Sequence, residues 1–379
     1  MLRLVLLILL LLSSLLCVFR APAFYLWYLA IMVTEFPLIF MALTKVVTFS
    51  GIRHRQFGVA GAVIGCIAFI LFLTPIARAY LLSGKINEGF ERAFGTGSAQ
   101  LADKPNQPPF SFLGMITGIN KAPDSYAVMN YKTVGGKAIT LDYYKAQATG
   151  FRPCLLVVHG GSWAGGDSRQ LPELNGYLAR GGYNVISINY RLAPEHISPA
   201  PVEDVFDAIA FIKLRAQELM IDTSKIVVLG RSAGAQIATV ASYRPGHPEI
   251  KGVIDIYGPA DMIWGYKHPN NPLVMNSCKV MEDFLGGTYD QVPQKYAESS
   301  PLELVTPSIP PTLIIHGEID PLVAYKHSPR LIEKLQTAGA KYYFLSIPWG
   351  THGCDYTLNG PSGQLTTYVI ERFMKVVTK

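Results

Sequence analysis

Residues 226–238 read Ile-Val-Val-Leu-Gly-Arg-Ser-Ala-Gly-Ala-Gln-Ile-Ala, and this stretch decides the fold of the chain. An apolar run typical of a buried strand leads into Gly-x-Ser-x-Gly, and the Ala-rich segment after it can continue as a helix. A sharp turn from strand to helix would hold Ser232 at its tip with the hydroxyl exposed, and Gly230 and Gly234 leave room for that turn. Because Gly-x-Ser-x-Gly also arises by chance, a nucleophilic Ser232 requires an acid, a base and an oxyanion hole elsewhere.

A serine hydroxyl is a weak nucleophile unless a base, itself oriented by a third group, takes its proton. Of the eight histidines, His352 is the best candidate base, because it lies in the Gly-flanked loop 349–353 directly after the apolar run 342–347. Parallel sheets bind and react at the carboxyl edge of their strands, which this loop can reach. His159 belongs to a different motif, and we expect it to be a structural hydrogen-bonding residue.

The candidate acid is Asp320, which follows the apolar run 312–315. It would accept the Nδ1 proton of His352, fix the tautomer of the ring and stabilise the imidazolium. Glu318 is a competitor for this role, and Asp355 is a weaker one. The chain order serine, acid, histidine is the order expected for α/β-hydrolases.

An oxyanion hole needs N–H donors aimed at the developing negative charge. The residue after the nucleophile can supply one backbone N–H. Residues 159–163, His-Gly-Gly-Ser-Trp, follow a strand-like run, and their glycines let the backbone approach a substrate closely. The predicted oxyanion-hole residues are Gly160, Gly161, Ser162 and Ala233.

Strand-like and helix-like runs alternate over residues 126–379, which predicts a mostly parallel sheet covered by helices on both faces. A Gly-Gly pair at 135–136 predicts a hairpin at its start. The less regular stretch 260–308, rich in Pro, Asn, Tyr and Met, is a candidate lid. We therefore assign 126–379 to one α/β catalytic domain.

The mean hydropathy of the whole chain is +0.25. Its first 80 residues are far more apolar than the residues that follow them. Three apolar runs cover residues 4–19, 22–44 and 58–77. The last two are long enough to cross a bilayer as helices and the first is slightly short. We expect a transmembrane region over 1–80 with three helices, the alternative being a cleaved leader followed by two spans. Glu35, inside the second run, should face protein or water unless the span boundary is shifted.

Charge around these runs bears on their orientation. With the N-terminus inside, the positive-inside rule weakly favours a catalytic domain on the extracytoplasmic side. The basic residues counted are Arg3, Lys45, Arg53 and Arg55 on one side against Arg20, Arg78 and Lys85 on the other.

Residues 81–125 form a linker in this scheme. Ile86, Phe90 and Phe94 recur at helical spacing, which predicts either an amphipathic helix on the lipid headgroups or a helix packed on the catalytic domain. Prolines then mark a turn or hinge, at positions Pro105, Pro108 and Pro109.

The composition does not indicate a nucleic acid, metal or cofactor as a partner. The net charge is +6 without a basic run, so nucleic acid is not expected. The five cysteines have neither metal-ligand spacing nor a paired framework. We expect no metal and no organic cofactor, and the sequence does not indicate the oligomeric state.

Residues 126–379 resemble the hormone-sensitive-lipase-like branch of the α/β-hydrolase family. The resemblance implies an α/β-hydrolase fold, a triad of Ser232, Asp320 and His352, and structural roles for 190–196 and Asp204. The matching blocks are 159–163, 190–196, 201–205, 230–234, 316–323 and 351–353.

Two positions depart from the family pattern. Ser162 replaces the third glycine of the oxyanion loop and keeps its N–H. Arg231 stands before the nucleophile, where the family usually has Asp; it could pair with a carboxylate or contact an anionic part of a substrate. Trp163 and Arg231 are the candidate substrate contacts.

The sequence therefore predicts a membrane-bound serine carboxylesterase or lipase-like hydrolase that cleaves a lipophilic ester through an acyl-enzyme. Ser232 attacks, and His352 moves the proton. An acyltransferase, amidase or peptidase using the same triad is the first alternative, since acyl-enzyme formation is common to all of them. A non-catalytic scaffold is the second.

Overall fold

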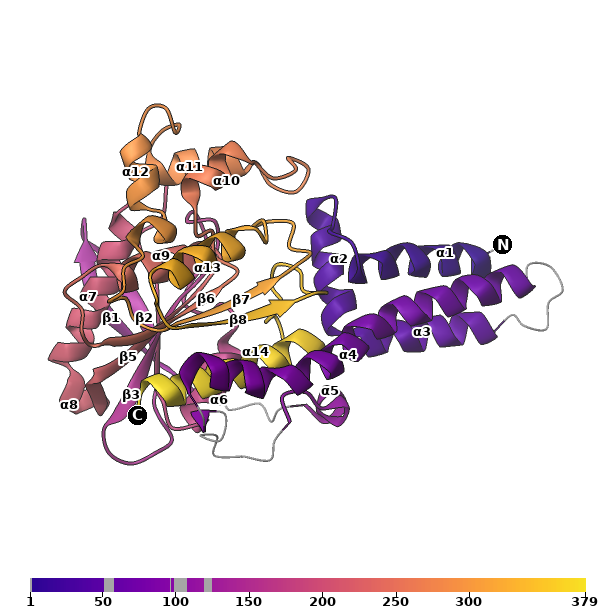
Figure 1. Cartoon of the computed structure of the whole chain (residues 1–379), viewed down its shortest axis with the longest axis horizontal. Coiled ribbons are helices and arrows are strands. Elements are labelled where there is room, and N and C mark those ends of the chain that lie inside the picture. The colour runs from indigo at the N-terminus through magenta and orange to yellow at the C-terminus, as the bar shows by residue number, and fades with distance from the viewer. Residues whose placement is uncertain (1, 51–57, 96, 99–107, 119–124) are drawn as a thin grey trace.

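The computed structural model describes residues 2–50, 58–95, 97–98, 108–118 and 125–379. Arg53, Arg55 and Pro105, which entered the arguments above, lie outside these residues. Figure 1 shows an α/β domain beside an elongated bundle of N-terminal helices.

The α/β domain is built on an eight-stranded sheet with the order β1-β2-β4-β3-β5-β6-β7-β8. The β1–β2 and β2–β4 pairs are antiparallel, and all pairs from β4–β3 to β7–β8 are parallel. The mostly parallel sheet predicted from the sequence is confirmed. The strands are β1 Ala127–Val134, β2 Lys137–Tyr144, β3 Arg152–Val158, β4 Asn184–Ile188, β5 Ile221–Arg231, β6 Ile250–Ile256, β7 Thr312–Gly317 and β8 Tyr342–Ile347.

Helices cover both faces of the sheet (Figure 1) because its central strands are apolar on both sides. One face packs on α7, α9 and α13, the other on α4, α6 and α14. The helices of this domain are α6 Pro172–Arg180, α7 Ala200–Leu214, α8 Ala216–Leu219, α9 Ala233–Tyr243, α10 Met262–Lys267, α11 Ser277–Leu285, α12 Pro293–Glu298, η3 Pro301–Leu304, α13 His327–Thr337 and α14 Pro361–Val377.

In the N-terminal region, several helices lie side by side and a further helix crosses their end (Figure 1). The side-by-side helices are α1, α3 and α4, while α2 lies between them and the α/β domain. The elements of this part are α1 Leu2–Ser14, η1 Leu15–Cys17, α2 Phe24–Glu35, α3 Pro37–Phe49, α4 Gly58–Phe94 and α5 Phe112–Thr117.

The expectation of one continuous helix through the second apolar run is wrong. The run breaks at Phe36 into α2 and α3, which are bent by 88°. Pro37 begins α3, a position where its missing N–H costs nothing, and it cannot continue the hydrogen-bond ladder of α2. The α3 helix has 13 residues, about 20 Å, which is shorter than a bilayer core of about 30 Å.

Glu35 ends α2 and faces protein, as expected. Its side chain is buried and accepts hydrogen bonds from Ser362 Oγ (2.5 Å) and the N–H of Gly363 (3.3 Å). These donors belong to the first turn of α14, where unpaired N–H groups favour a carboxylate. The bend at Phe36 therefore accompanies a contact between segments more than 300 residues apart.

The α4 helix runs without interruption from the bundle onto the α/β domain. Residue 80, placed above at the end of the transmembrane region, lies inside it. Ile86 and Phe90 are fully buried, and the ring of Phe90 lies 5.2 Å from that of Tyr343 on β8. Of the two predictions for this stretch, the helix packed on the domain is correct and the headgroup-bound helix is wrong.

Within the described ranges, one helix, α4, is long and apolar enough to cross a membrane, and the bent α2–α3 pair counts as a second only if both halves belong to one span. Such helices by themselves are weak evidence for a membrane protein.

Candidate active site

Ser232 occupies the turn between β5 and α9, with φ 54° and ψ −122°, a strained conformation for a residue with a side chain. The two flanking glycines make this turn possible. A Cβ on Gly230 would lie 2.1 Å from the carbonyl oxygen of Gly234, and a Cβ on Gly234 would lie 2.3 Å from that of His159. The turn holds Ser232 partly exposed while its neighbours on either side are buried.

The loops after β7 and β8 bring Asp320 and His352 together. His352 Nδ1 lies 2.7 Å from Asp320 Oδ2, and Asp320 Oδ1 accepts the N–H groups of Leu322 (2.8 Å) and Val323 (2.9 Å). Burial raises the pKa of Asp320, but the neighbouring His352 and His316 outweigh it and hold the pKa well below its usual range. Asp320 therefore stays ionised and able to orient the imidazole.

The competing acids are engaged elsewhere. Glu318 accepts a hydrogen bond from Ser346 Oγ (2.7 Å). Asp355 Oδ2 lies 2.5 Å from Arg231 Nε, and its other oxygen accepts the hydroxyl of Tyr257 (2.5 Å). Neither is hydrogen-bonded to His352 in the structure.

Tyr257 links the turn at Ser232 to residues 348–360, the loop that carries His352 and is called the histidine loop below. The N–H of Ser232 donates to the carbonyl of Ile256 (2.9 Å), and the next residue, Tyr257, lays its ring 4.3 Å from the imidazole of His352. Ser232 and His352 thus lie against the same short segment at the carboxyl edge of β6.

The loop after β3 carries Gly160, Gly161 and Ser162, but only the last two have an N–H available as an oxyanion donor. The N–H of Gly160 donates to Gln170 Oε1 (2.7 Å), so its assignment as an oxyanion donor is wrong. In the part of the chain that the structure describes, no acceptor is bonded to the N–H groups of Gly161, Ser162 or Ala233. These three remain the candidate donors, and Ala233 is the first residue of α9.

His159 is structural, as expected. Its ring stacks on Tyr190 at 4.2 Å, and Tyr190 donates its hydroxyl to the His159 carbonyl (3.0 Å). Burial lowers the pKa of His159, which favours the neutral ring and makes its Nδ1–H a donor to the carbonyl of Gly160 (2.7 Å). These contacts fix the loop that carries the candidate donors.

Arg231 does not reach a substrate. Its side chain is 2% exposed and forms an ion pair with Asp355. The expectation of a substrate contact is therefore wrong, and the carboxylate partner is the correct alternative. Successive side chains of a strand point to opposite faces of the sheet. The side chain of Arg231 therefore points away from the side to which Ser232 points.

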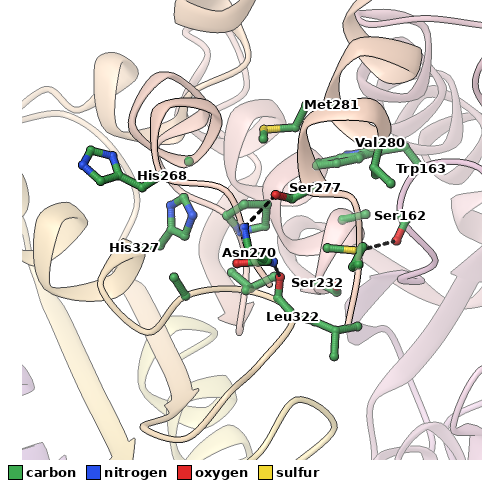
Figure 2. Close-up of a pocket in the computed structure, with 16 residues that line it drawn as sticks. Ser162, Trp163, Ser232, His268, Asn270, Ser277, Val280, Met281, Leu322 and His327 are labelled. Atoms are coloured by element: carbon green, nitrogen blue, oxygen red, sulfur yellow. Dashed lines mark hydrogen bonds between the residues drawn. The ribbon is translucent and has the colours of Figure 1, made fainter. Parts of the chain in front are cut away.

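A pocket opens beside Ser232 under the helices of the stretch 260–308. Its space measures about 490 Å³, including solvent at its mouth. Ser232 and Ser162 line this pocket together with Asn270, Ser277 and Met281 (Figure 2). The wall is mostly apolar, with a few polar groups.

Trp163 closes one end of this pocket. Its ring stacks on Phe284 of α11 at 4.5 Å, and its Nε1–H donates to Gln236 (2.9 Å). Trp163 therefore ties the oxyanion loop to the covering helices, and one edge of it lines the pocket.

Sequence reasoning missed several residues of the site. His327 lines the pocket, and burial, followed by the charge of His316, lowers its pKa to about 3, so it is neutral there. Gln170 holds the oxyanion loop, and Trp27 of α2 donates its indole N–H to the His352 carbonyl (2.7 Å). No local pattern marks these residues, since each acts through a contact distant in sequence.

Among the described residues, no group of three His, Cys, Asp or Glu side chains could hold a metal ion.

Comparison with known proteins agrees with this architecture. The chain is similar to two proteins of Mycobacterium tuberculosis (strain ATCC 25618 / H37Rv). "Esterase LipC" is 28% identical over 244 residues, covering 59% of this chain and 58% of LipC. "Probable carboxylic ester hydrolase LipM" is 25% identical over 260 residues, covering 64% and 59%. The chain thus spans less than two thirds of the length of these relatives.

Solved structures share the fold. A structure described as an arylesterase has a TM-score of 0.57 at 20% identity, covering 81% of this chain and 97% of that one. An esterase of Pyrobaculum calidifontis has a TM-score of 0.56 at 23% identity, covering 79% and 97%. The fold is therefore the α/β-hydrolase fold.

The family model described as BD-FAE matches residues 141–335, from β2 through the serine turn and the acid loop to α13. Because this match covers more than half of the chain, the chain belongs to the BD-FAE family.

Proposed function

We propose that this protein is a serine hydrolase of carboxylic esters, with Ser232 as nucleophile, His352 as base and Asp320 as the acid that orients it. The observation that carries the proposal is the 2.7 Å contact between His352 Nδ1 and Asp320 Oδ2, on loops that end at the same sheet edge as the strained turn of Ser232. The names of the relatives, an esterase and a probable carboxylic ester hydrolase, support ester chemistry.

In the proposed mechanism, Ser232 Oγ attacks the ester carbonyl while His352 Nε2 takes the hydroxyl proton. The oxyanion that forms accepts hydrogen bonds from the N–H groups of Ala233 and of Gly161 or Ser162, which have no other acceptor in the described chain. His352 gives its proton to the leaving alcohol, and the acyl group stays on Ser232. A water, deprotonated by His352, then releases the acid and restores the serine.

The proposal extends to a membrane-bound enzyme acting on a lipophilic ester. The α1–α3–α4 bundle presents large apolar side chains outward, among them Leu9 (56% exposed), Val46 (66%) and Val59 (82%). Such a surface is unfavourable in water and suited to lipid tails. The pocket beside Ser232 is also lined mainly by apolar groups.

Arg3 supports an orientation for this bundle. Its guanidinium donates to the carbonyls of Val47 (3.2 Å) and Thr48 (2.8 Å), so the start of α1 and the end of α3 lie together, at the end of the bundle away from the α/β domain (Figure 1). By the positive-inside rule that end is cytoplasmic, and the catalytic domain is extracytoplasmic.

A panel of p-nitrophenyl esters of increasing acyl length, hydrolysed by the detergent-solubilised full chain, tests the proposal, with Ser232→Ala as the blank. We expect hydrolysis by the wild type only, with kcat/KM rising from acetate to the medium-chain esters. Equal rates in the wild type and Ser232→Ala would contradict the mechanism. Adding glycerol distinguishes acyl transfer, since a transferase would form glyceride at the expense of free acid.

A further inference from the structure

One short segment of the N-terminal region, residues 20–35, contacts three of the loops around the candidate active site: those after β7 and β8 and the one between α10 and α11. We call it the crossing segment. It includes α2 and the residues leading into it, and Figure 1 shows it between the helical bundle and the α/β domain. Its contacts are polar as well as apolar, which distinguishes it from simple packing.

The strongest contacts are with the histidine loop. The indole Nε1–H of Trp27 donates to the carbonyl oxygen of His352 (2.7 Å), and the two rings lie 6.1 Å apart. Ile31 reaches the next residue, Gly353, where its Cδ1 would lie 3.2 Å from an added Cβ. Glu35 then binds the start of α14, which follows the loop. The crossing segment thus touches both the base and the far end of its loop.

The other contacts reach the acid loop and the candidate lid. Arg20 donates to the carbonyl of Glu318 (3.4 Å), two residues before Asp320. The N–H of Phe24 donates to the carbonyl of Leu273 (3.0 Å), and Asn271 Nδ2 donates to that of Pro22 (3.0 Å). Residues 271 and 273 belong to the loop between α10 and α11, which borders the pocket.

The histidine loop needs such support. Residues 348–360 lie between β8 and α14 without a helix or strand of their own, and loops outside regular structure are less fixed than the elements they connect. A displacement of about 1 Å of a catalytic group can cost about 100-fold in rate. Among the hydrogen bonds of the described chain, the donor to the His352 carbonyl comes from the N-terminal region rather than from the α/β domain.

We propose that Trp27 is a positioning residue for His352, and that the crossing segment completes the active site from the membrane region. This inference rests on the proposed hydrolase function and adds to it a dependence of turnover on the N-terminal helices. Trp27 acts through the backbone of the base and does not touch the reacting atoms.

Trp27→Phe tests this role, because it keeps an aromatic ring on α2 and removes the N–H donor together with part of the indole ring. Tyr25→Phe is the matched control. Tyr25 lies on the same helix, and its side chain is exposed to solvent (84%) rather than directed at the histidine loop. The full chain in detergent is assayed with a short, soluble ester. A fluorophosphonate titration counts active sites, and the thermal midpoint of each variant is recorded.

We expect Trp27→Phe to lower kcat per titrated site about threefold to tenfold, the scale of one hydrogen bond, with KM and the thermal midpoint unchanged. Tyr25→Phe should match the wild type. Equal kcat per site in the two variants would overturn the positioning role, as would a loss explained wholly by fewer titrated sites or a lower midpoint.

The same titration separates this inference from the proposed function. Labelling of the wild type but not of Ser232→Ala supports the hydrolase whatever the Trp27 variant does. A wild type that is not labelled would overturn both.

Discussion

At the scale of single residues, Arg231 and Asp355 form a buried ion pair beside the site. Both side chains are almost fully buried, and Asp355 also accepts the hydroxyl of Tyr257, whose ring touches His352. Breaking a buried pair leaves a charge without compensation, which costs far more than breaking an exposed one. The pair therefore joins the serine turn to the histidine loop through charge.

Replacing Arg231 should show this cost. We expect Arg231→Met to lower the free energy of unfolding by about 3–5 kcal/mol, because Asp355 stays buried and unpaired. Arg215→Met breaks an exposed pair with Glu218 and should cost far less, because solvent screens exposed charges. Urea unfolding of both variants measures the difference, and similar losses would contradict it.

Asp255 gives the fold a dependence on pH. Burial raises its pKa to about 6, against the hydrogen bond from the Gly258 N–H. Since the pKa in the folded state lies above the unfolded value of about 3.9, ionisation destabilises the fold as the pH rises from about 4 through about 6. Asp255→Asn removes this titration and keeps an oxygen acceptor for Gly258.

We expect the stability of Asp255→Asn relative to wild type to grow by about 2 kcal/mol between pH 4 and pH 8. Urea unfolding at the two pH values measures it. A difference that does not change with pH would show that Asp255 does not titrate in this range.

At the scale of elements, the turn between β5 and α9 depends on close backbone approach. The Cα of Gly234 faces the end of β3, where an added Cβ would meet the carbonyls of Val158 and His159 at 2.3 Å. Because backbone atoms cannot move aside as a flexible side chain can, any larger residue must displace the oxyanion loop. The serine turn and the oxyanion loop are thus one packing unit.

Gly234→Ala should therefore lose both stability and activity. We expect a loss of about 1–3 kcal/mol, typical of overpacking, and at least a tenfold lower kcat. Gly84→Ala on α4 has nothing within 4 Å of the added Cβ, and should raise stability by about 0.5–1 kcal/mol. Calorimetry and ester hydrolysis of both variants test this, and equal behaviour of the two would contradict it.

The local pattern of apolar residues was enough to predict most of the strands and helices of the α/β domain. The strands and helices from β2 to α14 follow from alternating apolar runs, and the run 342–347 coincides with β8. Pro37 is a local signal for the break between α2 and α3 that the length of the apolar run concealed. The partner of Glu35 could not be predicted, because it lies on α14, at the other end of the chain. Gly160 was misassigned for a similar reason, since its acceptor on Gln170 is not part of the motif.

At the scale of the whole molecule, the α4 helix connects the two parts of the protein. Its first half lies in the bundle and its second half packs on β8 and α14, where Tyr368 donates to Asn87 (2.6 Å). The crossing segment adds a second connection beside the candidate site. These two connections, α4 and the crossing segment, fix the position of the pocket relative to the helical bundle.

The proposed orientation can be measured in cells. A cysteine introduced at Lys334, on the exposed end of α13, should react with a membrane-impermeant maleimide added to intact spheroplasts, because the catalytic domain is extracytoplasmic in the proposal. A cysteine at Lys45 on α3, near the opposite end of the bundle, should react only after lysis. The reverse pattern would place the catalytic domain in the cytoplasm.

The central claim is that Ser232 is an activated nucleophile, and mapping the adduct of a fluorophosphonate probe on the full chain tests it most directly. Peptide mass spectrometry should find the adduct on Ser232, formed by the wild type, absent from Ser232→Ala and strongly slowed in His352→Ala and Asp320→Asn, which remove the base and the group that orients it. An adduct on another residue, or equal labelling of the wild type and Ser232→Ala, would contradict the account.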